Sequence, residues 1–153
     1  MKKVVKFGGS SLASAAQFKK VGDIIRAEES RRYVVPSAPG KRFAEDTKVT
    51  DMLYQCYELA EEGKKFDELL KKIRSRYDEI IQGLGLDLSL DSEFEVIKSQ
   101  FEEQAGKDYA ASRGEYLNGI VMANYLGYTF IDAAEVIFFD EHGVLDFDKT
   151  NRV

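Results

Sequence analysis

A short apolar strand that runs directly into a pair of glycines is the feature that most constrains this fold. The segment from Lys3 to Ala13 reads Lys-Val-Val-Lys-Phe-Gly-Gly-Ser-Ser-Leu-Ala. Its β-branched run predicts a buried strand, and the glycines let the backbone turn with its N–H groups pointing outward. Lys6, Gly8, Gly9 and Ser10 would then combine an ammonium, exposed amides and a hydroxyl in an anion site suited to a polyphosphate. A plain strand-to-helix turn is the alternative, because a turn glycine often serves only for its positive φ.

The bulk properties exclude several classes of protein. A length of 153 residues suits one domain with a core that needs no metal or disulfide. A formal net charge of −5 argues against a general nucleic-acid binder. No apolar run approaches the length of a membrane span, and the N-terminus enters a strand without a signal-peptide core. Cys56 is the only cysteine, which excludes an intrachain disulfide and a cysteine metal cluster. We therefore expect a cytoplasmic protein with no metal site and no membrane or nucleic-acid partner.

The hydrophobic pattern alternates between strand and helix periods. Ser14 and Gln17 fit a capping box for a first helix, and Tyr33 to Val35 reads as a second strand, so a parallel βαβ unit is expected. Polar residues 41–48 predict a mobile loop. Later patterns predict helices from Val49 to a stop at Gly63, from Phe66 to Gly83 and Gly85, from a cap of Ser92 and Glu95 to Phe101, and from Asp108 to Leu126, with strands over 128–131 and 136–139. Residues 64–105 are expected to form a helical subdomain beside the sheet.

Three segments, in order, resemble the aspartate kinases of the amino-acid kinase family. They are Val-Lys-Phe-Gly-Gly-Ser-Ser, then Tyr-Val-Val-Pro-Ser-Ala-Pro-Gly-Lys from Tyr33 to Lys41, and Ser-Arg-Gly-Glu-Tyr-Leu-Asn-Gly from Ser112 to Gly119. The resemblance runs from about Lys3 to Val153. It implies an α/β fold with a mainly parallel sheet of the amino-acid (carbamate) kinase type, in which residues 1–153 form the N-terminal amino-acid-binding lobe and end before the nucleotide-binding half.

The resemblance also implies a function. Aspartate kinases use ATP with Mg²⁺ to phosphorylate the side-chain carboxylate of L-aspartate, the first step toward lysine, threonine and methionine. By the same resemblance this chain would act on L-aspartate and ATP in a homo-oligomer. The matching positions are Lys6 as the catalytic residue, Lys6, Gly8, Gly9 and Ser10 as phosphate ligands, and Ser37, Thr50 and Glu115 as substrate ligands. The family's Arg-Gly-Gly-Ser-Asp segment and its regulatory ACT domains do not occur in the chain, so we expect the 153 residues alone to be inactive.

Each of these implied site residues also has a structural explanation that requires no bound molecule. Lys6 could be an exposed lysine at a strand end, Ser37 could bond its own backbone, and Thr50 could cap a helix. Glu115 could complete a capping box with Ser112. A glycine inside a strong helix costs about 1 kcal/mol relative to alanine, which indicates that something approaches Gly114 closely.

Other conspicuous residues are expected to be structural. His142 reads as a solvated surface residue, Cys56 as core, and Tyr54, Tyr57, Tyr109 and Tyr116 as packing side chains. Two alternative functions stay open: another member of the amino-acid kinase family, and a non-catalytic amino-acid-binding fragment.

Overall fold

Residues 1–152 are described by a computed structural model. Its sheet consists of two parallel strands, β1 (Lys3–Phe7) and β2 (Arg31–Pro36), in which Val5 pairs with Val34. The short 3-10 helix η1 (Gly9–Leu12) and the helix α1 (Ala15–Arg26) connect them. The predicted parallel βαβ unit is therefore confirmed.

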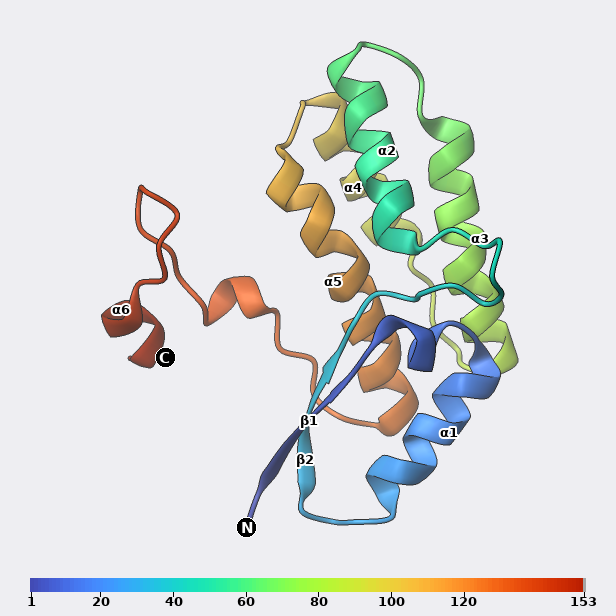
Figure 1. Cartoon of the computed structure of the whole chain (residues 1–153), viewed down its shortest axis with the longest axis vertical. Coiled ribbons are helices and arrows are strands. Elements are labelled where there is room, and N and C mark those ends of the chain that lie inside the picture. The colour runs from blue at the N-terminus through green and yellow to red at the C-terminus, as the bar shows by residue number, and fades with distance from the viewer. Residues whose placement is uncertain (153) are drawn as a thin grey trace.

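The first helix begins as its sequence predicts. Ser14 is the N-cap residue of α1, and its hydroxyl accepts a hydrogen bond from the Gln17 amide at 3.4 Å. Phe18, Val21 and Ile25 follow at helical spacing and are buried. The helix α1 starts at this cap, and its apolar stripe is buried. It returns the chain to the start of the sheet, so that β2 pairs with β1 in parallel (Figure 1).

Four longer helices form the rest of the core. They are α2 (Val49–Glu61), α3 (Asp67–Gly83), α4 (Asp91–Glu102) and α5 (Lys107–Leu126). The predicted stop signals hold, because Gly63, Gly85 and Gly127 adopt φ values of 70°, 66° and 73°. The predicted cap at Ser92 is wrong. Here α4 begins at Asp91, whose amide donates to the Ser89 hydroxyl just before the helix.

The helices share one hydrophobic core. Leu53 of α2, Tyr77 of α3, Phe101 of α4 and Leu117 of α5 are all fully buried members of the same cluster. Figure 1 shows α2 beside α3, α4 largely behind α2, and α5 running down past the two strands. Residues 64–105, the predicted helical subdomain, contain α3 and α4, and these share their core with α2 and α5.

After α5 the chain departs from prediction. Residues 128–131 form no strand, and residues 136–139 contribute only one isolated antiparallel bridge, between Phe139 and Leu145. The segment instead contains the 3-10 helix η2 (Ala133–Glu135) and the short helix α6 (Phe147–Asn151), and leads away from the helical layer (Figure 1). A β-rich run becomes a strand only when it pairs along its length, and within residues 1–152 these segments form no pairing beyond the single bridge at Phe139.

Two further observations concern the predicted turn at residues 141–143 and the apolar character of the helices. Gly143 has a φ of 77° in the turn predicted at residues 141–143. Among residues 1–152, no helix combines the length and apolar character that a membrane crossing requires.

Candidate functional site

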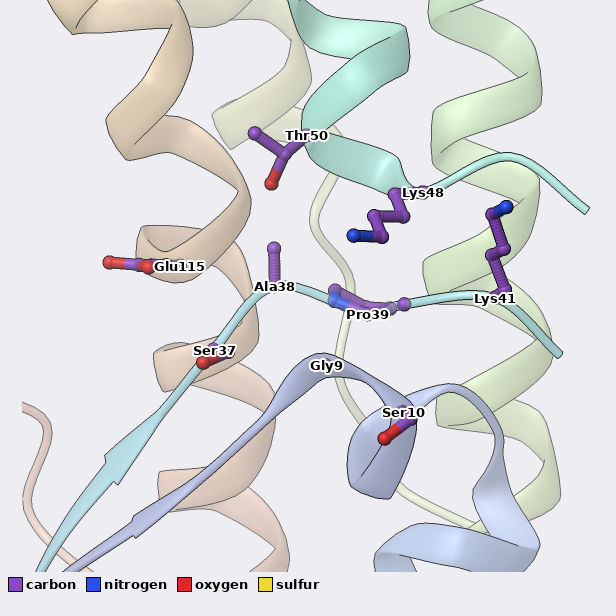
Figure 2. A pocket seen from close by; sticks show the side chains of 10 residues that line it. Gly9, Ser10, Ser37, Ala38, Pro39, Lys41, Lys48, Thr50 and Glu115 are labelled. Carbon is purple, nitrogen blue, oxygen red and sulfur yellow. The ribbon is translucent and has the colours of Figure 1, made fainter.

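A cavity of about 460 Å³ lies beyond the carboxyl ends of β1 and β2. Three elements build it: the turn after β1, the loop after β2 with the start of α2, and the middle of α5 (Figure 2). Its walls are formed by Gly9, Ser10, Ser37, Ala38, Pro39, Gly40, Lys41, Lys48, Thr50 and Glu115. The carboxyl end of a parallel sheet is where such folds generally bind ligands.

Close backbone packing brings the two strand-end loops together. The Ser37 amide donates to the Phe7 carbonyl at 3.1 Å, and the Gly40 amide donates to the Gly9 carbonyl at 2.8 Å. A Cβ on Gly9 would lie 2.9 Å from the Ala38 oxygen, and one on Gly40 would lie 2.7 Å from the Gly9 carbonyl carbon. Glycine is needed at both positions for close approach. Neither Gly8 nor Gly9 has a positive φ, so the plain-turn explanation does not apply to them.

The middle of α5 forms the second wall. A Cβ on Gly114 would lie 2.7 Å from the Ala38 Cβ, so the close approach predicted at this glycine is confirmed. The buried Asn118, one turn further, donates from Nδ2 to the Ser37 carbonyl at 2.7 Å. Tyr77 supports the wall from behind, because its hydroxyl donates to the Gly114 carbonyl at 2.7 Å. Burial raises the pKa of Tyr77, which keeps this donor protonated.

Glu115 lies exposed on α5 beside this contact. The capping-box explanation for it is wrong, because α5 begins at Lys107 and Ser112 is already inside the helix. The Ser112 hydroxyl donates instead to the Tyr109 carbonyl at 2.7 Å. Glu115 is therefore not used as a helix cap.

Thr50 lies in the first turn of α2. Its alternative as a helix cap is also wrong, because the N-cap residue is Lys48 and no side chain makes a capping hydrogen bond there. The Val49 amide donates to the Pro39 carbonyl at 3.2 Å, which ties the start of α2 to the loop. The Thr50 side chain lines the cavity (Figure 2).

The structure brings together most of the predicted site residues. Five of them line the cavity: Gly9, Ser10, Ser37, Thr50 and Glu115. Lys6 and Gly8 do not. Lys6 is exposed on β1, where it pairs with Val35. Gly8 is the N-cap residue of η1, and a Cβ added there would meet no atom within 4 Å.

Two basic side chains in the cavity wall were missed by the sequence analysis. Lys41 and Lys48 both line the cavity, and neither forms an ion pair with any other residue in the described part of the chain. Figure 2 shows the Lys48 ammonium between the start of α2 and the loop at Pro39. The sequence did contain a signal for these lysines, because basic residues cluster in the loop between Ser37 and Thr50, two residues predicted to bind substrate.

Two residues that were predicted to be structural, Cys56 and His142, have surroundings that agree with this prediction. Cys56 is fully buried, and burial raises the pKa of its thiol to about 12. His142 is exposed, and its imidazole lies 3.5 Å from the Glu141 carboxylate. Within residues 1–152, no three Asp, Glu, His or Cys side chains lie where they could hold a metal ion together.

Comparison with known proteins identifies relatives. Residues 1–151 match the amino acid kinase family. The chain is 41% identical to Aspartokinase 3 of Bacillus subtilis (strain 168) over 142 residues, which is 88% of this chain and 31% of that protein. Aspartate kinase from Clostridium acetobutylicum has 51% sequence identity and a TM-score of 0.92, over 97% of this chain and 34% of that one.

A more distant structure supports the fold alone. Aspartokinase III of E. coli, solved in complex with aspartate and ADP, gives a TM-score of 0.79 at 23% identity, over 99% of this chain and 36% of that one. The chain thus spans about a third of the length of the relatives that it matches. With nearly every residue covered by the family match, the chain belongs to the amino acid kinase family.

Proposed function

We propose that this chain forms the amino-acid-binding lobe of an aspartate kinase, spanning residues 1–153, with residues 64–105 as a helical subdomain. The observation that carries the proposal is the charge arrangement of the cavity, where one carboxylate, two lysines and three hydroxyl side chains line a common space. An amino acid with a second carboxylate carries the complementary groups, an ammonium and two carboxylates. The aspartokinase relatives favour L-aspartate among such acids.

Each side chain then has a role that its chemistry suits. Glu115 would accept hydrogen bonds from the substrate ammonium, while Ser37 and Thr50 would donate to substrate carboxylate oxygens. Lys6 and the turn of Gly8, Gly9 and Ser10 would face the phosphate side. The E. coli structure of the same fold was solved with aspartate and ADP, the kind of pair that is proposed here.

The reaction proposed is a direct phosphoryl transfer. A side-chain carboxylate oxygen of aspartate attacks the γ-phosphorus of ATP, the bond from that phosphorus to the β,γ-bridging oxygen breaks, and ADP leaves with 4-phospho-L-aspartate as the other product. No covalent nucleophile of the protein is required, because catalysis consists of positioning and charge stabilisation. Mg²⁺ would arrive bound to ATP. The step would begin the synthesis of lysine, threonine and methionine, in the cytoplasm and in a homo-oligomer.

The test is a coupled assay of ADP release by the full-length gene product, with L-aspartate and, separately, L-glutamate as acceptors. We expect turnover with L-aspartate, and a Lys6→Ala variant that loses orders of magnitude in kcat with little change in melting temperature. Lys3→Ala is the matched control, because Lys3 lies on the same strand but pairs with Glu28 at its other end. Turnover with glutamate alone would point to another amino-acid kinase. Near-normal kcat in Lys6→Ala, or an unfolded variant, would reject the role of Lys6.

The 153-residue chain by itself should show no appreciable turnover. Phosphoryl transfer needs both substrates held and the β- and γ-phosphates clamped from several sides, and the glycine turn with Lys6 supplies one side. The same assay on the purified 153 residues decides this point. Robust, Lys6-dependent ADP production would show that the nucleotide site lies within these residues, whereas aspartate binding without turnover agrees with a binding lobe.

A further inference from the structure

A single buried arginine on α3 ties together the loops that surround the cavity. The Arg76 side chain is only 4% exposed. Its Nη1 donates to the Thr47 carbonyl at 3.0 Å, and its Nη2 donates to the Gly40 carbonyl at 2.6 Å and the Ala13 carbonyl at 3.3 Å. Nη1 also lies 3.5 Å from a carboxylate oxygen of Asp46.

The three carbonyls belong to both halves of the cavity wall. Gly40 lines the cavity, and Thr47 immediately precedes Lys48, which also lines it. Ala13 follows η1, the turn that carries Gly9 and Ser10. One rigid guanidinium group therefore bridges the turn after β1 and the loop after β2, in addition to the direct hydrogen bond between Gly40 and Gly9.

Stability alone gives a poor account of an arginine at this place. Burying a guanidinium costs desolvation free energy, and replacing a buried ion pair with apolar residues is often neutral or stabilising. Moreover, Nε of Arg76 is buried without a hydrogen-bond partner among the described residues. A planar fork of donors does, however, suit the task of holding several carbonyls in fixed directions.

We propose that Arg76 is a positioning residue for substrate binding: by holding the carbonyls of Ala13, Gly40 and Thr47, it keeps the amino-acid side of the cavity in register with the phosphate side. The inference deepens the proposed function and rests on it. Arg76 does not touch the substrate, so it acts only through the loops. Its removal changes where Ser37, Lys48 and Thr50 lie relative to the glycine turn.

The experiment compares Arg76→Lys and Arg76→Ala in the full-length gene product. Arg74→Ala is the matched control, because Arg74 lies on the same helix but is 39% exposed and pairs with Asp78 and Asp91. The measurements are kcat, KM for aspartate, KM for ATP, melting temperature, and amide hydrogen exchange over residues 40–48. A displacement of about 1 Å in a site costs roughly 100-fold, so we expect kcat/KM for aspartate to fall by about 10- to 100-fold in Arg76→Lys.

Two readouts separate positioning from general stability. Lysine keeps the charge but not the fork, so Arg76→Lys should show the catalytic loss with little change in melting temperature. Added guanidinium ion should restore part of the activity of Arg76→Ala and none to Arg74→Ala. Arg76→Lys with the kinetics of the Arg74→Ala control, or no rescue of Arg76→Ala, would overturn the inference.

Further outcomes keep the inference separable from the proposed function. If neither Arg76 variant folds, Asp46→Asn tests the inference instead, because it weakens the contact between Arg76 and the loop. This variant should also raise KM for aspartate, and unchanged kinetics would overturn the inference. If the unmodified protein does not phosphorylate aspartate, the proposed function fails. Hydrogen exchange then still tests the hold of Arg76 on the loops. Faster exchange over residues 40–48 in Arg76→Lys supports that hold, and unchanged exchange rejects it.

Discussion

The helical layer of this molecule buries its large apolar side chains, whereas the strands and the segment after α5 leave many of theirs exposed. In α2–α5 the apolar stripes face one another, and side chains such as Leu53, Phe101 and Leu117 are fully buried. On the strands, Val4 and Val35 are 69% and 47% exposed, and the segment after α5 exposes further large apolar residues. The helices therefore supply most of the burial that stabilises the chain. The cavity lies where the two regions meet, with α5 and the start of α2 on one side and the strand-end loops on the other.

The largest effect that can test this contrast comes from removing matched aromatic side chains. Phe101 is fully buried in the helical layer, whereas Phe139 is 63% exposed after α5. Phe101→Ala should lower the free energy of unfolding by about 3–5 kcal/mol, since it leaves a cavity in the core. Phe139→Ala should change it by no more than about 0.5 kcal/mol. Urea denaturation of both variants measures the difference, and equal losses would contradict the division into a packed and an open region.

A smaller effect is expected where α5 contacts the cavity loop. Gly114→Ala places a methyl group 2.7 Å from the Ala38 Cβ, which should cost about 1–3 kcal/mol despite the higher helix propensity of alanine. Because Ala38 lines the cavity, affinity for aspartate should fall as well.

Gly119→Ala is the control for that substitution on the same helix. Its added methyl group meets only the edge of the Phe130 ring, which can move aside. Calorimetric titration of aspartate should show weaker binding for Gly114→Ala and unchanged binding for Gly119→Ala. If both bind normally, the contact between Gly114 and Ala38 does not shape the site.

The smallest effect concerns the pH dependence of the loop. Hydrogen bonds from Arg42 lower the pKa of Asp46 below its ordinary value of 3.8. A carboxylate with a depressed pKa in the folded state stabilises the fold above about pH 4, and the contribution is lost as pH falls through the folded-state pKa. We expect Asp46→Asn to be less stable by about 1 kcal/mol at pH 7, with the gap closing as pH falls below 3.8. Urea denaturation at several pH values measures it, and a gap that stays constant would contradict the assignment.

Elements whose signals are local were predictable from the sequence. The capping group at Ser14 and the glycine stops at Gly63 and Gly127 act within one turn of the chain, and the apolar stripe on α3 repeats along a single helix. All three predictions are confirmed. The strands predicted after α5 failed because a strand depends on a distant partner. The cap predicted at Ser92 failed by two residues, because α4 begins at Asp91 and its N-cap residue is Leu90.

The candidate site follows the same division between local and distant signals. Ser37 and Gly9 could be placed together because parallel strands end at one edge of a sheet. Lys48, Asn118 and Arg76 could not, because their roles depend on which loop meets which helix. Arg76 did carry a signal, since it lies on α3 three residues after Ile73 and four before Ile80, on the buried stripe where arginine is unusual.

The most direct test of the whole account is a calorimetric titration that removes one group from each partner. L-aspartate and succinate, which lacks the ammonium, are titrated into the full-length gene product and into Glu115→Gln. A charge-assisted hydrogen bond contributes about 1.5–3 kcal/mol, so Glu115→Gln should weaken aspartate binding by roughly 10- to 100-fold. Succinate binding should be the same in both proteins, because no ammonium meets Glu115. An equal loss for both ligands, or no loss for aspartate, would contradict the assignment of this cavity as the amino-acid site.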